Sequence, residues 1–234
     1  MKIMGFYKST MLDYPDHLAS AIFTRECNYR CPYCHNGDLV LETSSQGDVE
    51  ESEIFEHLKK RRNLLEGLVI SGGEPTLSSH LIPFIERVKE LGLKVKLDTN
   101  GSNPSVVEKL IERNQVDYFA MDIKNSFEKY PETTGVKDVD LTCIKKSIDL
   151  IIKSNVQHEF RTTIMKEFHQ ERDIIEIVRY IRGADVYYLQ QFEPTDKMIG
   201  KGPYTFYSVE EMLAIKKEIE QYQYVSRIDI RGRF

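Results

Sequence analysis

Short apolar runs rich in β-branched residues alternate with amphipathic stretches along the chain from residue 18 onward. Runs of this kind, bounded by polar and turn-forming residues, predict β-strands. Strands are expected at residues 19–24, 67–71, 94–98, 118–123, 158–164, 186–192 and 225–230. Strands that alternate with helical stretches in this way are typical of βαβ units and a parallel sheet.

Between the expected strands, apolar residues recur three or four positions apart, which predicts helices with one face on the sheet. These helices are expected at residues 54–65, 81–91, 106–113, 141–154, 170–182 and from 208 onward. Gly92 supplies a stop for the second helix. Ser208 begins the last helix, and Glu211 three residues later completes a capping box.

Six strand–helix units follow from this pattern, whereas a full eight-unit barrel typically needs about 250 residues. We therefore expect an α/β fold in which a parallel sheet forms an incomplete (β/α)6, TIM-like open barrel. The 234 residues fit one domain, with residues 1–17 as an N-terminal extension and residues 18–234 as the partial barrel. Right-handed crossovers place the carboxyl ends of the strands on one face. Residues 43–48 are the expected mobile loop.

Composition narrows the class of protein. Hydrophobic residues make up 41% of the chain and charged residues 29%, and no apolar run approaches the roughly 18 residues of a membrane span. The opening residues lack the apolar core and cleavage site of a secretory signal, so we expect a cytoplasmic protein. The net charge is −5, with Lys and Arg scattered among Asp and Glu, so a nucleic-acid partner is not expected.

Three of the four cysteines lie within eight residues, in the segment FTRECNYRCPYCHN after the first expected strand. One loop can wrap the thiols of Cys27, Cys31 and Cys34 around one metal centre. An iron–sulfur cubane has four irons, so three local thiols leave one iron open to an outside ligand. A closed zinc site with His35 as fourth ligand is the alternative, although chelation by adjacent side chains is strained. Cys143 stands alone in a helical stretch, where we expect a small core residue.

Polar or glycine residues lie at the carboxyl end of each of the next three expected strands, or directly after it. They are Gly72, Gly73 and Glu74 of VISGGEP, Asp98, Thr99 and Asn100 of KLDTNG, and Asp122 and Lys124 of YFAMDIK. Because the carboxyl ends of barrel strands form the site face, these residues are expected to share one site.

Each of these motifs has a chemical and a structural interpretation. A glycine pair lets a ligand approach the backbone closely, and Glu74 offers an acceptor for an ammonium group. Asn100 and the glycine after it could form only a turn. Asp122 and Lys124 lie on the same side of a strand and could form a simple ion pair. Alternatively, Asp122 accepts hydrogen bonds from a ligand while Lys124 neutralises the ligand's carboxylate.

The spacing Cys27-x3-Cys31-x2-Cys34, with an aromatic residue before the last cysteine, resembles the signature of the radical S-adenosylmethionine (SAM) superfamily. The resemblance implies a [4Fe–4S] cluster held by the three cysteines, with SAM bound through its amino group and carboxylate to the open iron. It places Tyr33 near the adenine, unless Tyr33 is only a packing aromatic. It also assigns residues 72–74 to the SAM amino group.

Four polar residues on the fifth and sixth expected strands fall where the superfamily often contacts the SAM carboxylate, ribose or adenine. These residues are Arg161, Thr162, Gln190 and Gln191. Buried polar residues at strand ends can also satisfy one another, so the structural interpretation stays open.

The motifs DTNG and MDIK, together with CPYCHN, resemble the branch of the superfamily that activates glycyl radical enzymes. The opening GFYKSTMLDYP resembles most the activating proteins of anaerobic ribonucleoside-triphosphate reductase. This resemblance implies reductive cleavage of SAM to a 5′-deoxyadenosyl radical, which generates a glycyl radical on the partner enzyme, and a flavodoxin- or ferredoxin-type electron donor. Two departures stand out: Asp16 replaces a usual glycine, and Arg25-Glu26 replaces a common Gln-Gly.

Two other functions stay open. A radical SAM enzyme that acts on a small molecule or peptide, as in a 7-carboxy-7-deazaguanine synthase-like ring contraction, would use the same cofactors but turn over without a protein partner. A non-enzymatic zinc or iron–sulfur binding module would bind no SAM and would show four protein ligands.

Overall fold

The structure is a computed structural model that describes residues 1–41, 47–196 and 198–232. Most of the loop predicted at residues 43–48 lies outside this part of the chain. Eight strands form one sheet in chain order. They are β1 (Ile3–Thr10), β2 (Ala19–Thr24), β3 (Gly67–Gly72), β4 (Lys94–Thr99), β5 (Tyr118–Asp122), β6 (Gln157–Ile164), β7 (Val186–Gln191) and β8 (Arg227–Arg231).

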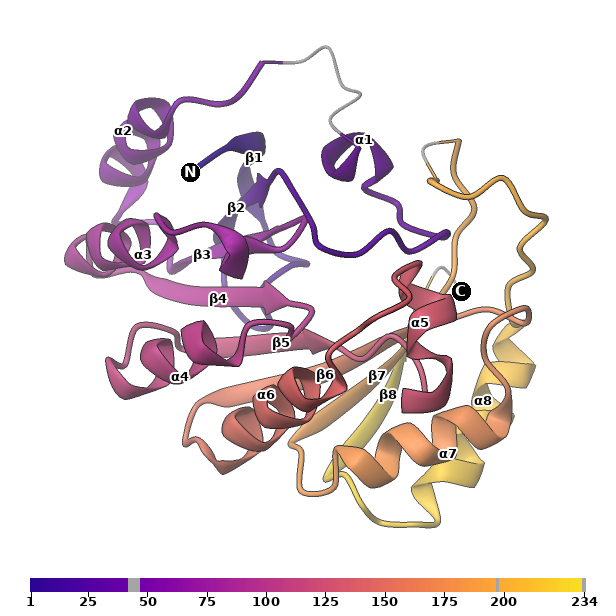
Figure 1. Ribbon diagram of the computed structural model, residues 1–234. Coiled ribbons are helices and arrows are strands. Elements are labelled where there is room, and N and C mark those ends of the chain that lie inside the picture. The colour runs from indigo at the N-terminus through magenta and orange to yellow at the C-terminus, as the bar shows by residue number, and fades with distance from the viewer. Residues whose placement is uncertain (42–46, 197, 233–234) are drawn as a thin grey trace.

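The helices connect successive strands and cover the outer face of the curved sheet (Figure 1). They are α1 (Gly37–Val40), α2 (Glu51–Arg61), α3 (Leu81–Glu90), α4 (Pro104–Glu112), α5 (Tyr130–Thr134), α6 (Leu141–Lys153), α7 (Glu171–Tyr180) and α8 (Val209–Glu220). Two short 3-10 turns, Pro75–Leu77 and Phe127–Lys129, follow β3 and β5.

The predicted architecture is confirmed. Strands β2 to β8 pair in parallel, and six helix-containing connections join them. Strands β1 and β8 are the two edges of the sheet, so the barrel is open. The last helix begins as predicted, because Glu211 N–H donates to the Ser208 hydroxyl and the Glu211 carboxylate accepts from Ser208 N–H.

Four details differ from the sequence-based expectations. The short helices α1 and α5 were not predicted. The segment at residues 1–17 contains β1, which pairs antiparallel with β2 and was not among the predicted strands. Helix α2 ends at Arg61, so Leu65 packs in the core from the connection that follows. Cys143 is a partly exposed residue in the first turn of α6, where its thiol donates to Asp140 at 3.4 Å, and not a core residue.

Alternation along the strands divides the interior into two layers. Outward-facing residues pack against the helices in the main hydrophobic core, as Ile22, Leu68 and Leu97 do. Inward-facing residues at the amino ends of β2, β3 and β5 form a second cluster with Tyr14, which follows β1. This cluster fills the lower part of the barrel and leaves the carboxyl ends of the strands for the polar residues.

No helix within the described residues has both the length and the apolar character needed to cross a membrane.

Candidate active site at the carboxyl ends of the strands

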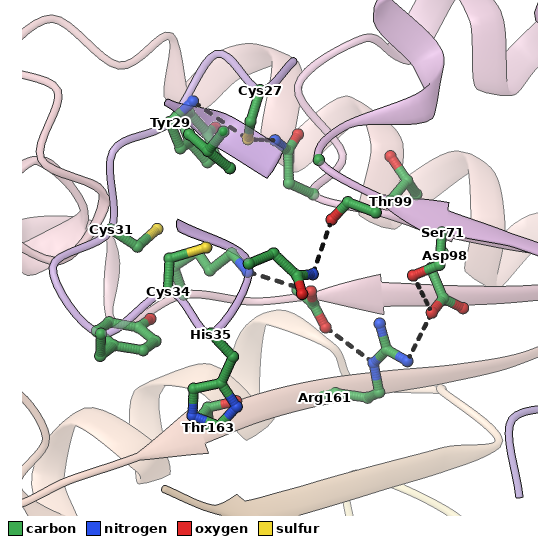
Figure 2. Close-up of a pocket in the computed structure, with 18 of the residues that line it drawn as sticks. Cys27, Tyr29, Cys31, Cys34, His35, Ser71, Asp98, Thr99, Arg161 and Thr163 are labelled. Atoms are coloured by element: carbon green, nitrogen blue, oxygen red, sulfur yellow. Dashed lines mark hydrogen bonds and ion pairs between the residues drawn. The ribbon is translucent and has the colours of Figure 1, made fainter. Parts of the chain in front are cut away.

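A cavity of about 250 Å³ lies where the sequence predicts the site face. One side is formed by the loop after β2, which carries Cys27, Cys31 and Cys34 (Figure 2). The other side is formed by the ends of β3 to β7. Its lining residues include Ser71, Gly72, Gly73, Asp98, Thr99, Asn100, Asp122, Lys124, Arg161, Thr163 and Gln190. The structure therefore brings residues from six strand ends around one cavity.

Backbone hydrogen bonds hold the cysteine loop at both of its flanks. Arg30 N–H donates to the carbonyl of Thr134 at 2.7 Å, at the end of α5. Gly200 N–H, in the connection between β7 and α8, donates to the carbonyl of Pro32 at 2.7 Å. Close to Cys34, the Asn36 amide donates to the carbonyl of Gly72 at 3.1 Å. The loop is thus fixed to three separate parts of the barrel.

Burial makes the three thiols poor acids in the protein alone. It raises the pKa of Cys27 to about 11 and that of Cys31 to about 12, and it raises the pKa of Cys34 as well. The positive charge of Lys124 opposes this effect at all three. Thiolates in this cavity therefore need the charge of a bound metal centre, whose binding releases the thiol protons.

The residues present fit an iron–sulfur cluster with one open iron. Three thiols line one cavity, which is the donor set that such a cluster requires. In the described part of the chain, no group of three or more His, Cys, Asp or Glu side chains is arranged to hold a single metal ion. Tyr29 and Tyr33 also line this cavity, and their buried hydroxyls have no hydrogen-bond partner within the described residues. Buried hydroxyls without a partner beside the cavity fit a polar ligand there.

The glycine pair is required by the backbone of the cysteine loop. Gly72 has φ of +120°, and a Cβ atom there would lie 2.2 Å from the amide nitrogen of Thr24. A Cβ atom at Gly73 would lie 1.8 Å from the carbonyl oxygen of Glu26. Both glycines line the cavity, where the lack of side chains lets a ligand approach the backbone closely.

Glu74 is placed differently from Gly72 and Gly73. Its carboxylate is 1% exposed and accepts four hydrogen bonds, from the amide and hydroxyl of Thr76, the Thr99 hydroxyl and Asn100 N–H. Burial raises the pKa of Glu74, although these donors oppose the rise. Glu74 is not among the residues that line the cavity. It joins the end of β3 to the end of β4 and so supports the rim.

A chain of alternating charges crosses the wall formed by β4, β5 and β6. The Arg161 guanidinium lies 3.3 Å from Asp98 and donates to Asp122 at 2.8 Å. The Lys124 ammonium donates to the other oxygen of Asp122 at 3.1 Å. Lys96, which is 2% exposed, lies 3.0 Å from Asp98. The ion pair predicted for Asp122 and Lys124 is thus present within the cavity wall.

These charges set the ionisation of the wall. Burial favours the neutral form of Asp122, but Arg161 and Lys124 outweigh burial and lower its pKa to about 2. Burial also opposes the charged form of Lys124, yet Asp122 holds the pKa of Lys124 well above its usual value. Both side chains are therefore charged at neutral pH, and each has hydrogen-bonding capacity left for a ligand.

Tyr33, within the cysteine loop, forms an aromatic layer with Phe168 and His169. Its ring is 5.9 Å from that of Phe168 and 6.4 Å from that of His169. The Nδ1 atom of His169 accepts from Met165 N–H at 3.3 Å, so its Nε2 atom carries the proton and donates to the carbonyl of Lys124 at 2.8 Å. Burial lowers the pKa of His169 to about 4. A neutral histidine thus supports Lys124.

Two of the predicted SAM-contacting residues face away from the cavity. Thr162 accepts a hydrogen bond from the Tyr187 hydroxyl at 2.8 Å on the helix-facing side of β6. The Gln191 amide donates to the carbonyl of Tyr207 at 2.9 Å. Side chains alternate along a strand, so Thr163 and Gln190 are the neighbours that line the cavity.

Sequence reasoning missed three polar residues of the site. Ser71 donates to Asp98 at 2.9 Å, and Asn36 and Thr163 line the cavity, as does His35, which was considered only as a zinc ligand. Alternation along strands gave a signal for Ser71, which shares a face with the buried Val69, and for Thr163, which shares a face with Arg161. Asn36 follows the cysteine motif directly, but its bond to Gly72 joins residues 36 positions apart and has no local signal.

Comparison with known proteins shows the family of the chain. Residues 21–181 match the Radical SAM superfamily, which is more than half of the chain. A protein of Methanocaldococcus jannaschii assigned as a glycyl-radical enzyme activating enzyme is 41% identical over 199 residues, which cover 83% of this chain and 81% of that one. The 7-carboxy-7-deazaguanine synthase of Koribacter versatilis is 27% identical over 184 residues, which cover 76% of each chain. The chain therefore belongs to the radical SAM superfamily and is a radical SAM enzyme.

A solved structure shows the same fold. The crystal structure of SuiB from Streptococcus suis superposes with a TM-score of 0.69 at 16% identity, covering 91% of this chain and 48% of that chain. At this level of identity the likeness concerns the fold alone. It agrees with the partial, TIM-like barrel described above.

Proposed function

We propose that this protein is a glycyl-radical enzyme activating enzyme whose partner is an anaerobic ribonucleoside-triphosphate reductase. The observation that carries the radical chemistry is the cavity in which three thiols of one loop face the charged wall of Asp98, Asp122, Lys124 and Arg161. The 41% identity to an assigned activating enzyme supports the choice of reaction. When bound, a reduced [4Fe–4S] cluster supplies the electron that cleaves SAM to methionine and a 5′-deoxyadenosyl radical, which removes a hydrogen atom from a glycine Cα.

The residues of this chain have separate tasks in that reaction. Cys27, Cys31 and Cys34 would hold the cluster, and the peptide groups of Gly72 and Gly73 would receive the SAM amino group. The charged wall offers acceptors on Asp98 and Asp122 to hydroxyl or amino groups and a cation on Lys124 to the carboxylate. Tyr33 and the aromatic layer would exclude water from one side of the cavity.

A reaction on a small molecule is the second candidate, and the match to a 7-carboxy-7-deazaguanine synthase favours it. Both functions use the same cavity and the same cofactors. They differ in whether a protein partner is needed for hydrogen abstraction.

The test is to reconstitute the protein anaerobically, reduce it with dithionite and add SAM with purified anaerobic ribonucleoside-triphosphate reductase. A glycyl-radical doublet in the electron paramagnetic resonance spectrum, together with released 5′-deoxyadenosine, is the expected result. Deoxyadenosine without the doublet would reject the proposed partner and direct the search to small molecules.

Two cysteine variants serve as a matched pair in this experiment. Cys34→Ala removes a thiol from the cavity and should abolish SAM cleavage. Cys143→Ala removes a thiol from the surface of α6 and should leave cleavage unchanged. Full cleavage by Cys34→Ala would reject the cluster assignment.

A further inference from the structure

Cys27 lines a second cavity besides the main one. This second cavity has a volume of about 260 Å³ and is lined by Glu26, Cys27, Arg30, Val40 and Leu41. Cys31 and Cys34 line the main cavity but not the second one. Cys31 is buried, whereas Cys27 and Cys34 are partly buried. Of these three cysteines, Cys27 alone therefore borders both cavities.

The rim of the second cavity is apolar on one side. Leu41 directly follows the short helix α1 and is 45% exposed, and its neighbour Val40 is buried beneath it. An exposed leucine beside a cavity is a feature of docking surfaces, because its burial by a partner is favourable. None of the residues of the charged wall lines this second cavity, although Val40 lines both cavities.

The charge of the rim is positive. Arg30 is exposed, and its guanidinium donates to the carbonyls of Cys27 at 2.5 Å and Tyr29 at 2.8 Å. None of the ion pairs within the described residues involves Arg30. The acidic residue of the rim, Glu26, is paired with Lys2 at 2.6 Å. Arg30 therefore supplies the uncompensated charge of a surface on a protein whose net charge is −5.

We propose that the surface formed by Glu26, Arg30, Val40 and Leu41 around Cys27 is the docking site of a one-electron carrier protein with acidic residues around its cofactor. The inference rests on the proposed function, which consumes one electron for each SAM cleaved. The carrier is oxidised by one electron and the centre held by the cysteines is reduced by one, with no bond made or broken. Because electron transfer slows steeply with distance, docking beside Cys27, which borders this cavity, gives a short path to the centre. The positive rim steers an acidic carrier to it.

The test uses the reconstituted protein and a bacterial flavodoxin in its hydroquinone form. Leu41→Glu places a negative charge on the rim without removing a hydrogen bond of the cysteine loop. It should weaken flavodoxin binding at least tenfold, measured by titration calorimetry on both the cluster-loaded and the cluster-free protein. It should slow cluster reduction by flavodoxin, followed by the loss of visible absorbance, to a similar degree. Arg30→Glu should act in the same direction.

Two controls make the outcome specific. Leu213→Glu changes a leucine of α8 that is 53% exposed, and Arg172→Glu changes an exposed arginine of α7; neither should alter flavodoxin binding. Dithionite is small and needs no docking surface, so SAM cleavage by Leu41→Glu with dithionite should equal that of the unchanged protein.

The outcomes separate the two proposals. Unchanged flavodoxin binding by Leu41→Glu and Arg30→Glu, or no flavodoxin binding by the unchanged protein, would overturn the docking site while the dithionite reaction still supports the proposed function. Loss of the dithionite reaction in the unchanged protein would instead reject the proposed function.

Discussion

The carbonyl oxygen of Glu26 lies 1.8 Å from the position that a Cβ atom at residue 73 would occupy. The two segments are also joined by hydrogen bonds, from Gly73 N–H to the Thr24 carbonyl at 2.9 Å and from Glu74 N–H to the Glu26 carbonyl at 2.8 Å. Both contacts are made by backbone, which cannot rotate away as a side chain can. The cysteine loop and the glycine pair therefore form one rigid unit.

Gly73→Ala should break this unit. The added methyl group forces two backbone segments apart, and the expected loss of stability is about 3 kcal/mol. Urea unfolding measures the loss, and iron content after reconstitution should fall with it. Gly47→Ala is the matched control, because a Cβ atom there would meet no atom within 4 Å. An unchanged unfolding midpoint for Gly73→Ala would contradict this account.

The two departures from the usual glycines both fall on left-handed backbone. Asp16 has φ of +60° and Glu26 has φ of +67°. Glutamate is less tolerant of this conformation than aspartate, whose short side chain suits it. Glu26→Gly should therefore stabilise the fold by about 0.5 kcal/mol, since relief of strain exceeds the entropic cost of glycine. Asp16→Gly should change stability little. Urea midpoints compare the two, and a larger gain for Asp16→Gly would refute the ranking.

Lys124→Met should separate SAM binding from cluster assembly. Loss of a charged hydrogen-bond donor to the ligand costs about 1.5–3 kcal/mol, so SAM affinity should fall at least about tenfold. Iron content should stay close to that of the unchanged protein. Lys146→Met, on the exposed side of α6, is the control. Equal loss of iron and of SAM binding would show that Lys124 has a structural role instead.

Arg161→Met should destabilise the fold in a way that depends on pH. It leaves Asp98, Asp122 and Glu159 without the cation they share, at a cost of about 3–5 kcal/mol near neutral pH. In the unchanged protein the pKa of Asp122 is lowered to about 2, so its contribution to stability is full above pH 4 and is lost as the pH falls toward 2. In the variant the carboxyl pKa values rise. The difference in free energy of unfolding between the unchanged protein and Arg161→Met should therefore become smaller from pH 7 to pH 5. Urea titrations that give the same difference at both pH values would contradict this prediction.

His169 should make the fold sensitive to mild acid. Burial lowers its pKa to about 4, below the value of about 6.5 for an exposed histidine. The neutral ring of His169 therefore makes its whole contribution to the free energy of unfolding above pH 6.5. This contribution, up to about 3 kcal/mol, is lost as the pH falls toward 4. His169→Gln should be less stable at pH 7 but should lose less on acidification. Parallel stability curves for the two proteins between pH 7 and 4 would rule out this assignment.

Much of the fold could be predicted because its signals are local. Apolar runs and helical spacing located β2 to β8 and six of the helices between them, but not the short helices α1 and α5, and the capping box located the start of α8. Strand β1 was missed because most of its residues are half-buried or exposed and carry no alternating pattern. Cys143 was misplaced because helical spacing alone does not tell which face an amphipathic helix buries at its first turn.

The candidate site could be predicted only in part, for a similar reason. Motifs identified the residues at the strand ends. Which of two neighbouring side chains faces the cavity depends on how the strand is oriented in the sheet, and in the structure Thr163 rather than Thr162, and Gln190 rather than Gln191, line the cavity. The role of Glu74 depends on donors from residues 76 to 100, which meet it only in the folded chain.

The order of the strands bears on how the protein is made. Each strand from β2 onward pairs with the strand synthesised before it, so the sheet can extend step by step as the ribosome releases the chain. Glu159, fully buried on β6, lies 3.8 Å from Arg161 and accepts hydrogen bonds from the Tyr118 hydroxyl at 2.9 Å and from Arg231 at 2.7 and 2.8 Å. A nascent chain that lacks β8 therefore lacks two of the three hydrogen bonds that this buried carboxylate accepts. Completion of the barrel fold waits for the synthesis of β8.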